Sequence, residues 1–184
     1  MRRRDLVPLA VAALLTVGCS AAPTPQPAVS GPPPASTGTA PPGPPTAVRI
    51  PALGIDTAPI PLGVAPDGTA EVPADYARVG WFAGGGRSAA TVLLGHVDSR
   101  SGPAVFHRLR DLAPGDRVEV ERGGQRAVYA VERVEQVAKD AFPTFAVFGA
   151  TGEDVLRLVT CAGAFDRGAR SYTDNLVVHA VRTG

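Results

Sequence analysis

The feature that most limits what this chain can fold into is a proline-rich tract between residues 20 and 46. It holds ten prolines and no charged residue, with Ser, Thr, Ala and Gly between them. Such a tract cannot bury a core and favours extended polyproline conformation. We therefore expect a disordered, semi-rigid tether, with a proline-rich ligand for a recognition domain as the alternative. The remaining residues, 47–184, are enough for one domain with a core of its own.

The residues before the tract have the pattern of an export signal. Arginines at positions 2–4 precede an apolar run from Leu6 to Val17, which is too short to span a bilayer comfortably. The run leads into Cys19 through a segment, 16–19, that resembles a bacterial lipobox. We expect residues 1–19 to be a lipoprotein signal ending at Cys19, with an uncleaved anchor or simple secretion as alternatives. A lipid there would hold the protein on the outer face of the cell membrane.

The rest of the chain has the composition of a mainly β domain. The net charge of the full chain is +1 and no basic patch is interleaved with aromatic residues, so we expect no nucleic-acid partner. Abundant Val, Gly and Pro favour strands and turns. The clearest hairpin joins 117–121 to 127–134 through Gly123-Gly124, and a short helix or irregular turn is expected at 105–112. Further strands are predicted at 48–51 with Ile55, 91–97, 156–161 and 175–181. Many short strands indicate a closed barrel or a sandwich.

The candidate chemistry centres on one cysteine of the folded part. Cys161 ends an apolar strand pattern, and the histidines are His96, His107 and His179. Cysteine catalysis needs a thiolate, a proton partner and a group that stabilises an oxyanion. A lone buried cysteine or a histidine at a strand end is more often structural, and these residues lack the spacing of a metal cluster. The residues alone therefore leave a catalytic and a structural interpretation open.

Two short motifs contain the candidate histidine and cysteine: Leu94–Ser99 reads LGHVDS and Leu158–Cys161 reads LVTC. They resemble the histidine motif and the nucleophile motif of sortases, the bacterial transpeptidases that attach proteins to cell walls. Further matches follow the order of the family: 79–81, 102–106, 114–118 and 172–178. The pattern is most similar to the actinobacterial class F sortases and covers residues 47–184.

The resemblance implies a fold and a reaction. The fold would be a closed eight-stranded sortase-type β-barrel with short helices in its connections. The reaction would be extracytoplasmic cysteine transpeptidation, in which an LPXTG-type sorting signal is cleaved at Thr–Gly through a thioacyl-enzyme and transferred to an amine. The implied partners are sorting-signal peptides of surface proteins, an amine such as a cell-wall precursor, and the membrane through the N-terminal lipid or anchor. We expect a monomer without a cofactor, and no carboxylate cluster indicates calcium.

The same resemblance implies the site residues. Cys161 would be the nucleophile, His96 its proton partner, and an arginine would bind the developing oxyanion. In many sortases that arginine stands just before the last strand, where this chain has Asn175. We expect Arg170 to take the role, with Arg167 or neither as the alternatives. Thr160 is expected to line the substrate groove, and Asp98 to orient His96 or to cap a turn.

Two other functions remain as alternatives. A barrel that binds peptides without turnover would have no need of His96, Cys161 and Arg170 together. A papain-type peptidase would carry its cysteine on a helix, with His and Asn downstream, whereas here the histidine precedes the cysteine. Alkylation of the thiol would abolish either enzyme and leave a binder functional.

Overall fold

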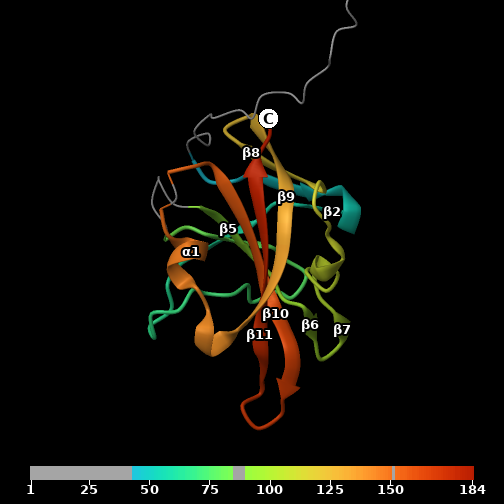
Figure 1. Ribbon diagram of the computed structural model, residues 1–184, viewed down its shortest axis with the longest axis vertical. Coiled ribbons are helices and arrows are strands. Elements are labelled where there is room, and N and C mark those ends of the chain that lie inside the picture. Colours follow the sequence, from blue (N-terminus) through green and yellow to red (C-terminus); the bar gives the residue numbers. More distant parts are fainter. Residues whose placement is uncertain (1–42, 85–89, 151) are drawn as a thin grey trace, which may run out of the picture. The chain divides into compact units, whose positions relative to one another are not determined.

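The computed structural model describes residues 43–84, 90–150 and 152–184. The predicted signal peptide and all but the end of the predicted tether lie outside these residues. The described part is a curled, half-barrel sheet with few helices (Figure 1). Its strands are β1 (Ala47–Ile50), β2 (Ile55–Thr57), β3 (Ile60–Leu62), β4 (Gly80–Phe82), β5 (Thr91–Leu94), β8 (Arg117–Arg122), β9 (Gln125–Ala138), β10 (Val155–Asp166) and β11 (Ser171–Arg182).

These strands follow the order β2-β1-β8-β9-β11-β10-β5-β4-β3, and a small separate ribbon pairs β6 (Asp98–Ser99) with β7 (Gly102–Pro103). The helices are short: η1 (Pro51–Leu53), η2 (Leu109–Asp111), η3 (Lys139–Ala141) and α1 (Thr144–Phe148). In the described ranges, no helix is long and apolar enough to cross a membrane.

The hairpin predicted around Gly123-Gly124 is confirmed. Arg122 pairs with Gln125, and the two glycines between them have φ angles of 53° and 78°. A two-residue turn of this kind needs positive φ at both positions, which glycine adopts without strain. Strand β9 is longer than predicted, because it continues beside β11 as far as Ala138.

Strands β10 and β11 form a long hairpin at the centre of the sheet. Beyond the strands predicted at 156–161 and 175–181, pairing continues to Asp166 and Ser171. On its other edge, β10 pairs in parallel with β5, from Thr91 beside Leu156 to Leu94 beside Val159. This parallel pair brings the end of β5 to the same place as the middle of β10.

The core lies on both faces of the central strands. One cluster fills the inside of the curl and includes Leu93, Phe106, Tyr129 and Leu158. A second cluster packs on the other face, where Val147 of α1 meets side chains of β5, β10 and β11. All four residues of β5 are therefore buried. Full burial of each aliphatic side chain contributes about 1.5–3 kcal/mol, so the middle of the sheet is the most firmly held part.

The predicted mainly β class is confirmed. Among the described residues, the sheet differs from the expected closed eight-stranded barrel in its number of strands and in being a half-barrel. Nine strands form the main sheet, with β2 and β3 at its two ends. The extra strand arises because Gly54, at a φ of 68°, turns the chain so that Ile55–Thr57 pairs back on β1. The short helix expected within 105–112 is present as η2.

Candidate active site

Cys161 lies on β10 where the strand passes from the core to the surface. The two preceding residues, Val159 and Thr160, are buried, and every residue of β10 from Gly163 onward is exposed. Pairing with β11 shifts between Ala162 and Phe165, and Gly163 has a φ of 80°. The strand therefore bends directly after the cysteine, whose thiol is free and half-buried.

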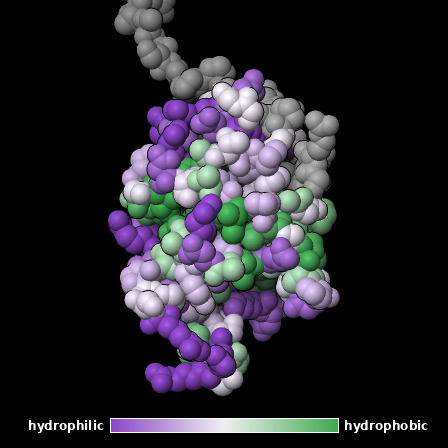
Figure 2. Space-filling model, turned by 180° about the vertical axis from the view of Figure 1, so that it is seen from behind, coloured by the Kyte–Doolittle hydropathy of each residue, from purple (hydrophilic) through white to green (hydrophobic). Residues whose placement is uncertain are grey.

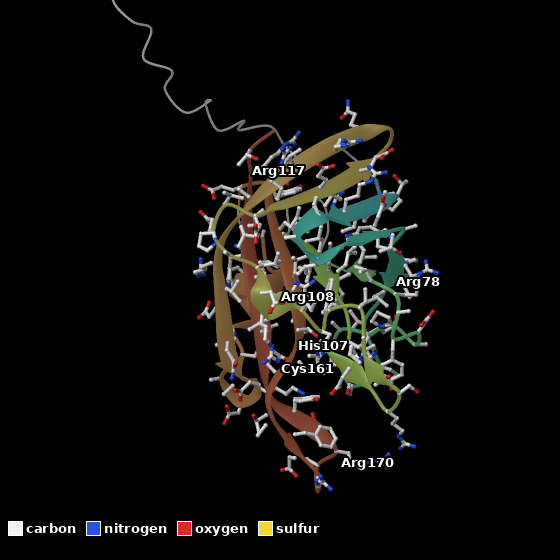
Figure 3. All side chains as sticks on the ribbon, turned by 90° about the vertical axis from the view of Figure 1, so that its right-hand side faces the viewer. Arg78, His107, Arg108, Arg117, Cys161 and Arg170 are labelled. Carbon is white, nitrogen blue, oxygen red and sulfur yellow. The ribbon has the colours of Figure 1, made fainter. Side chains whose placement is uncertain are left out.

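Cys161 is one of the residues that border a small cavity of about 110 Å³. Apolar side chains form its walls, and its polar or ionisable lining comes from Thr160, His107, Arg110, Gln136 and Cys161 itself. Figure 3 shows His107 and Cys161 next to each other. The hydroxyl oxygen of Thr160 is buried and has no hydrogen-bond partner among the described residues. Alternation along β10 puts the side chain of Cys161 on the face of Val159, opposite to the side chains of Thr160 and Ala162 that border this cavity.

His96 reaches the same region through the parallel pairing of β5 with β10. It follows β5 by two residues, and the N–H of the preceding Gly95 donates to the carbonyl oxygen of Val159 at 3.2 Å. A Cβ on Gly95 would lie 2.6 Å from a ring carbon of Phe106, so a larger residue there would displace this buried ring. The backbone of His96 therefore runs beside the end of the buried half of β10.

The imidazole ring of His96 is held on its other side. Its Nε2 lies 2.7 Å from the carbonyl oxygen of Pro73, and the ring of Tyr76 packs on it with 4.3 Å between centroids. Because a carbonyl oxygen only accepts, Nε2 is the nitrogen that carries the proton of this hydrogen bond. Nδ1 is then the nitrogen of His96 that is free to exchange a proton.

His107 is a second histidine at the cavity, and the sequence did not single it out for catalysis. Its Nδ1 lies 3.2 Å from the carbonyl oxygen of Val97. By the same reasoning Nδ1 donates and Nε2 is free. His107 and Arg110 come from one turn of chain that packs against β11, so only this long-range packing brings them to Cys161. No local spacing in the sequence signals that contact.

Asp98 has a different partner from the one expected. Its carboxylate accepts a hydrogen bond from the hydroxyl of Tyr172, which ties the β6–β7 ribbon to β11. This hydrogen bond is the main reason why the pKa of Tyr172 is raised above its usual value. Asp98 therefore holds the β6–β7 ribbon against β11, near the bend of the β10–β11 hairpin.

Arg170 and Arg167 lie apart from the cavity. Both occupy the turn beyond the last pair of the hairpin, Asp166 with Ser171. The carboxylate of Asp166 accepts the backbone N–H groups of Gly168 and Ala169 at 2.7 and 3.0 Å, which fixes this turn. Figure 3 shows Arg170 at the tip of the hairpin, away from Cys161. Thr160 and Cys161 thus both border the cavity, and the backbone of His96 runs beside them. Arg170 is not among the residues that border the cavity.

Within the parts that the structure describes, His, Cys, Asp and Glu side chains form no group of three that could hold a metal ion. The chemistry that this arrangement offers is nucleophilic, with a thiol, two imidazoles and one guanidinium near a bend in a strand. A nucleophile of this kind suits attack on a carbonyl carbon.

Comparisons with known proteins agree with this chemistry. A family model described as the sortase domain matches residues 48–183. Solved structures with the same fold include sortase C1 of Streptococcus agalactiae in complex with MTSET, at 24% identity over 75% of this chain and 68% of that chain, with a TM-score of 0.57. Sortase C-1 of Actinomyces oris is 21% identical over 75% and 73%, with a TM-score of 0.56. A lid mutant of sortase A from Corynebacterium diphtheriae is 19% identical over 75% and 69%, with a TM-score of 0.56. No curated protein matches the sequence.

Proposed function

The chain belongs to the sortase family of cysteine transpeptidases, and from that premise we propose that it cleaves an LPXTG-type sorting signal at the Thr–Gly bond outside the cytoplasm. The observation that carries this proposal is the position of Cys161, a free and half-buried cysteine just before the bend of β10, beside the backbone that leads to His96. The buried half of β10, up to Thr160, holds the backbone of Cys161 in place. The exposed half, from Gly163 onward, is where we propose that the substrate peptide binds.

The proposed reaction begins with transfer of the thiol proton from Cys161 to Nδ1 of His96. The thiolate attacks the threonine carbonyl carbon, and the electrons of the C=O bond move to oxygen. When the oxyanion collapses, the C–N bond breaks and His96 returns its proton to the leaving amine. A second amine then attacks the thioacyl carbon and gives a proton to His96, and the C–S bond breaks to release the thiolate. The carbonyl of Pro73, held on Nε2, keeps the ring oriented through both proton transfers.

The oxyanion needs a cation or a set of N–H donors. The sequence motifs imply Arg170 for that role, and Arg170 is the donor we propose. Thr160 is proposed to line the groove for the substrate, since its hydroxyl faces no described hydrogen-bond partner.

The subtype, the anchor and the natural partners belong to the same proposal. The motifs favour a class F sortase that joins surface proteins to a cell-wall amine and is tethered by a lipid on Cys19 through the tract 20–46. The mass of the mature protein and the release of Cys19→Ala into the medium test the anchor. A mature N-terminus at Cys19 with the mass of a diacylglycerol is expected, and an unmodified Cys19 in a membrane-bound protein would contradict it.

The test of the function uses the full-length protein, an LPXTG-type peptide and a glycine-based amine. Mass spectrometry of the tryptic peptide 158–167 should show an acyl adduct on Cys161, distinct from Cys19, and the ligated product should accumulate. Cys161→Ala should remove both.

The two histidines form a matched pair, because each has one ring nitrogen that donates to a backbone carbonyl oxygen. His96→Gln should lower turnover more than His107→Gln does. A folded wild-type protein without adduct across a panel of sorting peptides would contradict the proposal.

A further inference from the structure

We infer that the cavity on the inner face of β10 binds a small anion, a carboxylate or an inorganic oxyanion, at a site separate from the thiol. The cavity has a volume of about 110 Å³. Liquid water fills that volume with roughly four molecules, so the cavity has room for an anion of about four or five non-hydrogen atoms. The inference goes beyond the proposed function, because it requires no sorting signal and no acyl transfer.

The cavity lies on the face of β10 that the proposed reaction does not use. Successive side chains of a strand point to opposite faces. Thr160 and Ala162 border the cavity, and Ala162 belongs to the core cluster inside the curl, as does Leu176, which pairs with Thr160 across the hairpin. The side chain of Cys161, between them, points to the other face. An anion in the cavity would therefore contact the strand from behind the nucleophile.

A buried hydroxyl is the strongest sign that the cavity holds a ligand. Thr160 is only 4% exposed, and its Oγ1 has no hydrogen-bond partner among the described residues. A buried polar group without a partner is costly, and such groups are rare in folded proteins. The side chains of Val97, Phe106 and Leu176, which also line the cavity, are apolar. An occupant of the cavity would supply the partner that these side chains cannot.

The polar part of the lining carries positive charge. It consists of His107, Arg110 and Gln136, and no Asp or Glu of the described ranges borders the cavity. Arg110 makes no ion pair or hydrogen bond with another described residue, whereas the neighbouring Arg108 pairs with Asp111 at 2.8 Å. A guanidinium and a hydroxyl that border one small space both donate hydrogen bonds. Anionic oxygen is the acceptor that suits them best.

The fold explains why these donors line the same cavity. Phe106 and Leu109 are completely buried and anchor the segment that ends in η2. Its turns close by hydrogen bonds between residues three apart, and in such turns side chains three apart lie on the same side. His107 and Arg110 therefore lie together at the cavity. Nδ1 of His107 lies 3.2 Å from the carbonyl oxygen of Val97, which leaves Nε2 to donate to an anion whenever the ring is protonated.

A carboxylate that adjoins this lining is already engaged. Asp174 accepts a hydrogen bond from Nε2 of Gln136 at 2.6 Å and does not itself border the cavity. It forms no ion pair with Arg110. The guanidinium of Arg110 thus keeps its charge for a ligand from solution.

The first arm of the test is isothermal titration calorimetry of the full-length protein with sodium phosphate and, separately, with sodium acetate, both at constant ionic strength. At least one of the two anions should bind at a single saturable site. Arg110→Gln should weaken that affinity by about tenfold or more, because it removes a charged hydrogen-bond donor. Arg108→Gln is the matched control: it removes the same charge from a side chain that does not border the cavity, and its affinity should stay within about twofold of wild type.

The second arm tests the hydroxyl and the place of binding. Thr160→Val keeps the branched shape and loses the donor, so it should weaken the affinity by about tenfold or more, whereas Thr160→Ser keeps the hydroxyl and should stay within about threefold of wild type. In ¹H–¹⁵N spectra of the wild type, the amide resonances of residues 160–162 should shift with the affinity that calorimetry gives. Arg110→Gln changes an exposed side chain and keeps the test decisive if Thr160→Val does not fold.

Two results would overturn the inference. One is a folded protein that binds neither anion in a saturable way, or binds with the same affinity in wild type and Arg110→Gln. The other is a set of shifts confined to the exposed turn that carries Arg167 and Arg170, because the anion would then bind to surface arginines and not in the cavity.

Discussion

The two halves of the β10–β11 hairpin differ sharply although they are one continuous pair of strands. From Val155 to Thr160, β10 is buried except at Arg157, and β11 is buried from Leu176 to Ala180. From Gly163 to Asp166, β10 is exposed, and the turn beyond it is hydrophilic at the projecting end of the molecule (Figure 2). Cys161 lies at the boundary between the core half and the projecting half.

This difference shows how one strand both holds and exposes a nucleophile. The core half fixes the backbone of Cys161 through β5 on one side and β11 on the other. The projecting half leaves the sheet at the bend and opens a path to the thiol. Substitutions in the two halves should therefore have unequal effects on stability, and four predictions test this contrast.

The largest effect is expected in the core half. Leu158 is completely buried, so Leu158→Ala should lower the free energy of unfolding by about 2–5 kcal/mol, through lost burial and the cavity left behind. Urea denaturation followed by circular dichroism measures this. A loss below about 1 kcal/mol would mean that the core half is not the firmly held part.

The next effect concerns pH. Burial and the nearby charges of Arg157 and Arg133 lower the pKa of His179 to about 4, and Glu135, 3.2 Å from Nε2, opposes them only in part. Between the unfolded pKa of 6.5 and about 4, the unfolded chain binds a proton that the folded chain does not. Stability from the neutral ring is therefore fully present above pH 6.5 and lost as the pH falls, by about 2 kcal/mol between pH 7 and pH 5.

Urea midpoints at several pH values measure this loss, with His179→Val as the matched control that keeps the strand position apolar. The variant should lack this component of the pH dependence. Parallel curves for the two proteins would contradict the assignment.

A smaller effect is expected at the boundary. Gly163 has a φ of 80°, and a Cβ there would lie 2.4 Å from the hydroxyl of Thr173. Gly163→Ala should cost on the order of 1–2 kcal/mol of stability and also lower turnover, because the bend that follows Cys161 would shift. Gly168→Ala, in the turn of the projecting half, is the control. Normal turnover in a folded Gly163→Ala would show that the bend does not position the thiol.

The smallest effect belongs to the projecting half. Phe165 is 52% exposed and meets Tyr172 edge-on at 5.2 Å between ring centroids. Phe165→Ala should therefore lower the free energy of unfolding by less than about 1 kcal/mol. A loss as large as that of Leu158→Ala, measured in the same urea series, would remove the contrast between the two halves.

Local patterns predicted much of this fold. Alternating residues and Gly123-Gly124 predicted the β8–β9 hairpin, and the apolar runs 91–97 and 156–161 predicted the two strands that pair in parallel. The extension of the central hairpin to Asp166 and Ser171 was missed, because its residues are exposed and lack an apolar face. Strand periodicity is visible in a sequence only where one face of the strand is buried.

The candidate site was predictable only in part. The motifs at the ends of two predicted strands pointed to His96 and Cys161. Because β5 and β10 pair in parallel, the backbones of these two residues lie side by side in the structure. His107 and Arg110 carried no such signal, because their place in the lining of the cavity depends on how one turn packs against β11. Arg170 stays a prediction, and the structure places it in the turn between Asp166 and Ser171.

The parallel pairing of β5 with β10 also affects how this protein folds. Parallel strands cannot join through a tight turn, so Thr91 and Leu156 meet only after the long intervening chain has been ordered. Contacts between residues so far apart form slowly, since the entropy of closing the loop is lost before the contact stabilises anything. Cys161 pairs with Asn175, which follows it in the chain, so the ribosome adds the cysteine before its strand partner. Until β11 has been made and paired, the thiol lacks the surroundings that it has in the folded protein.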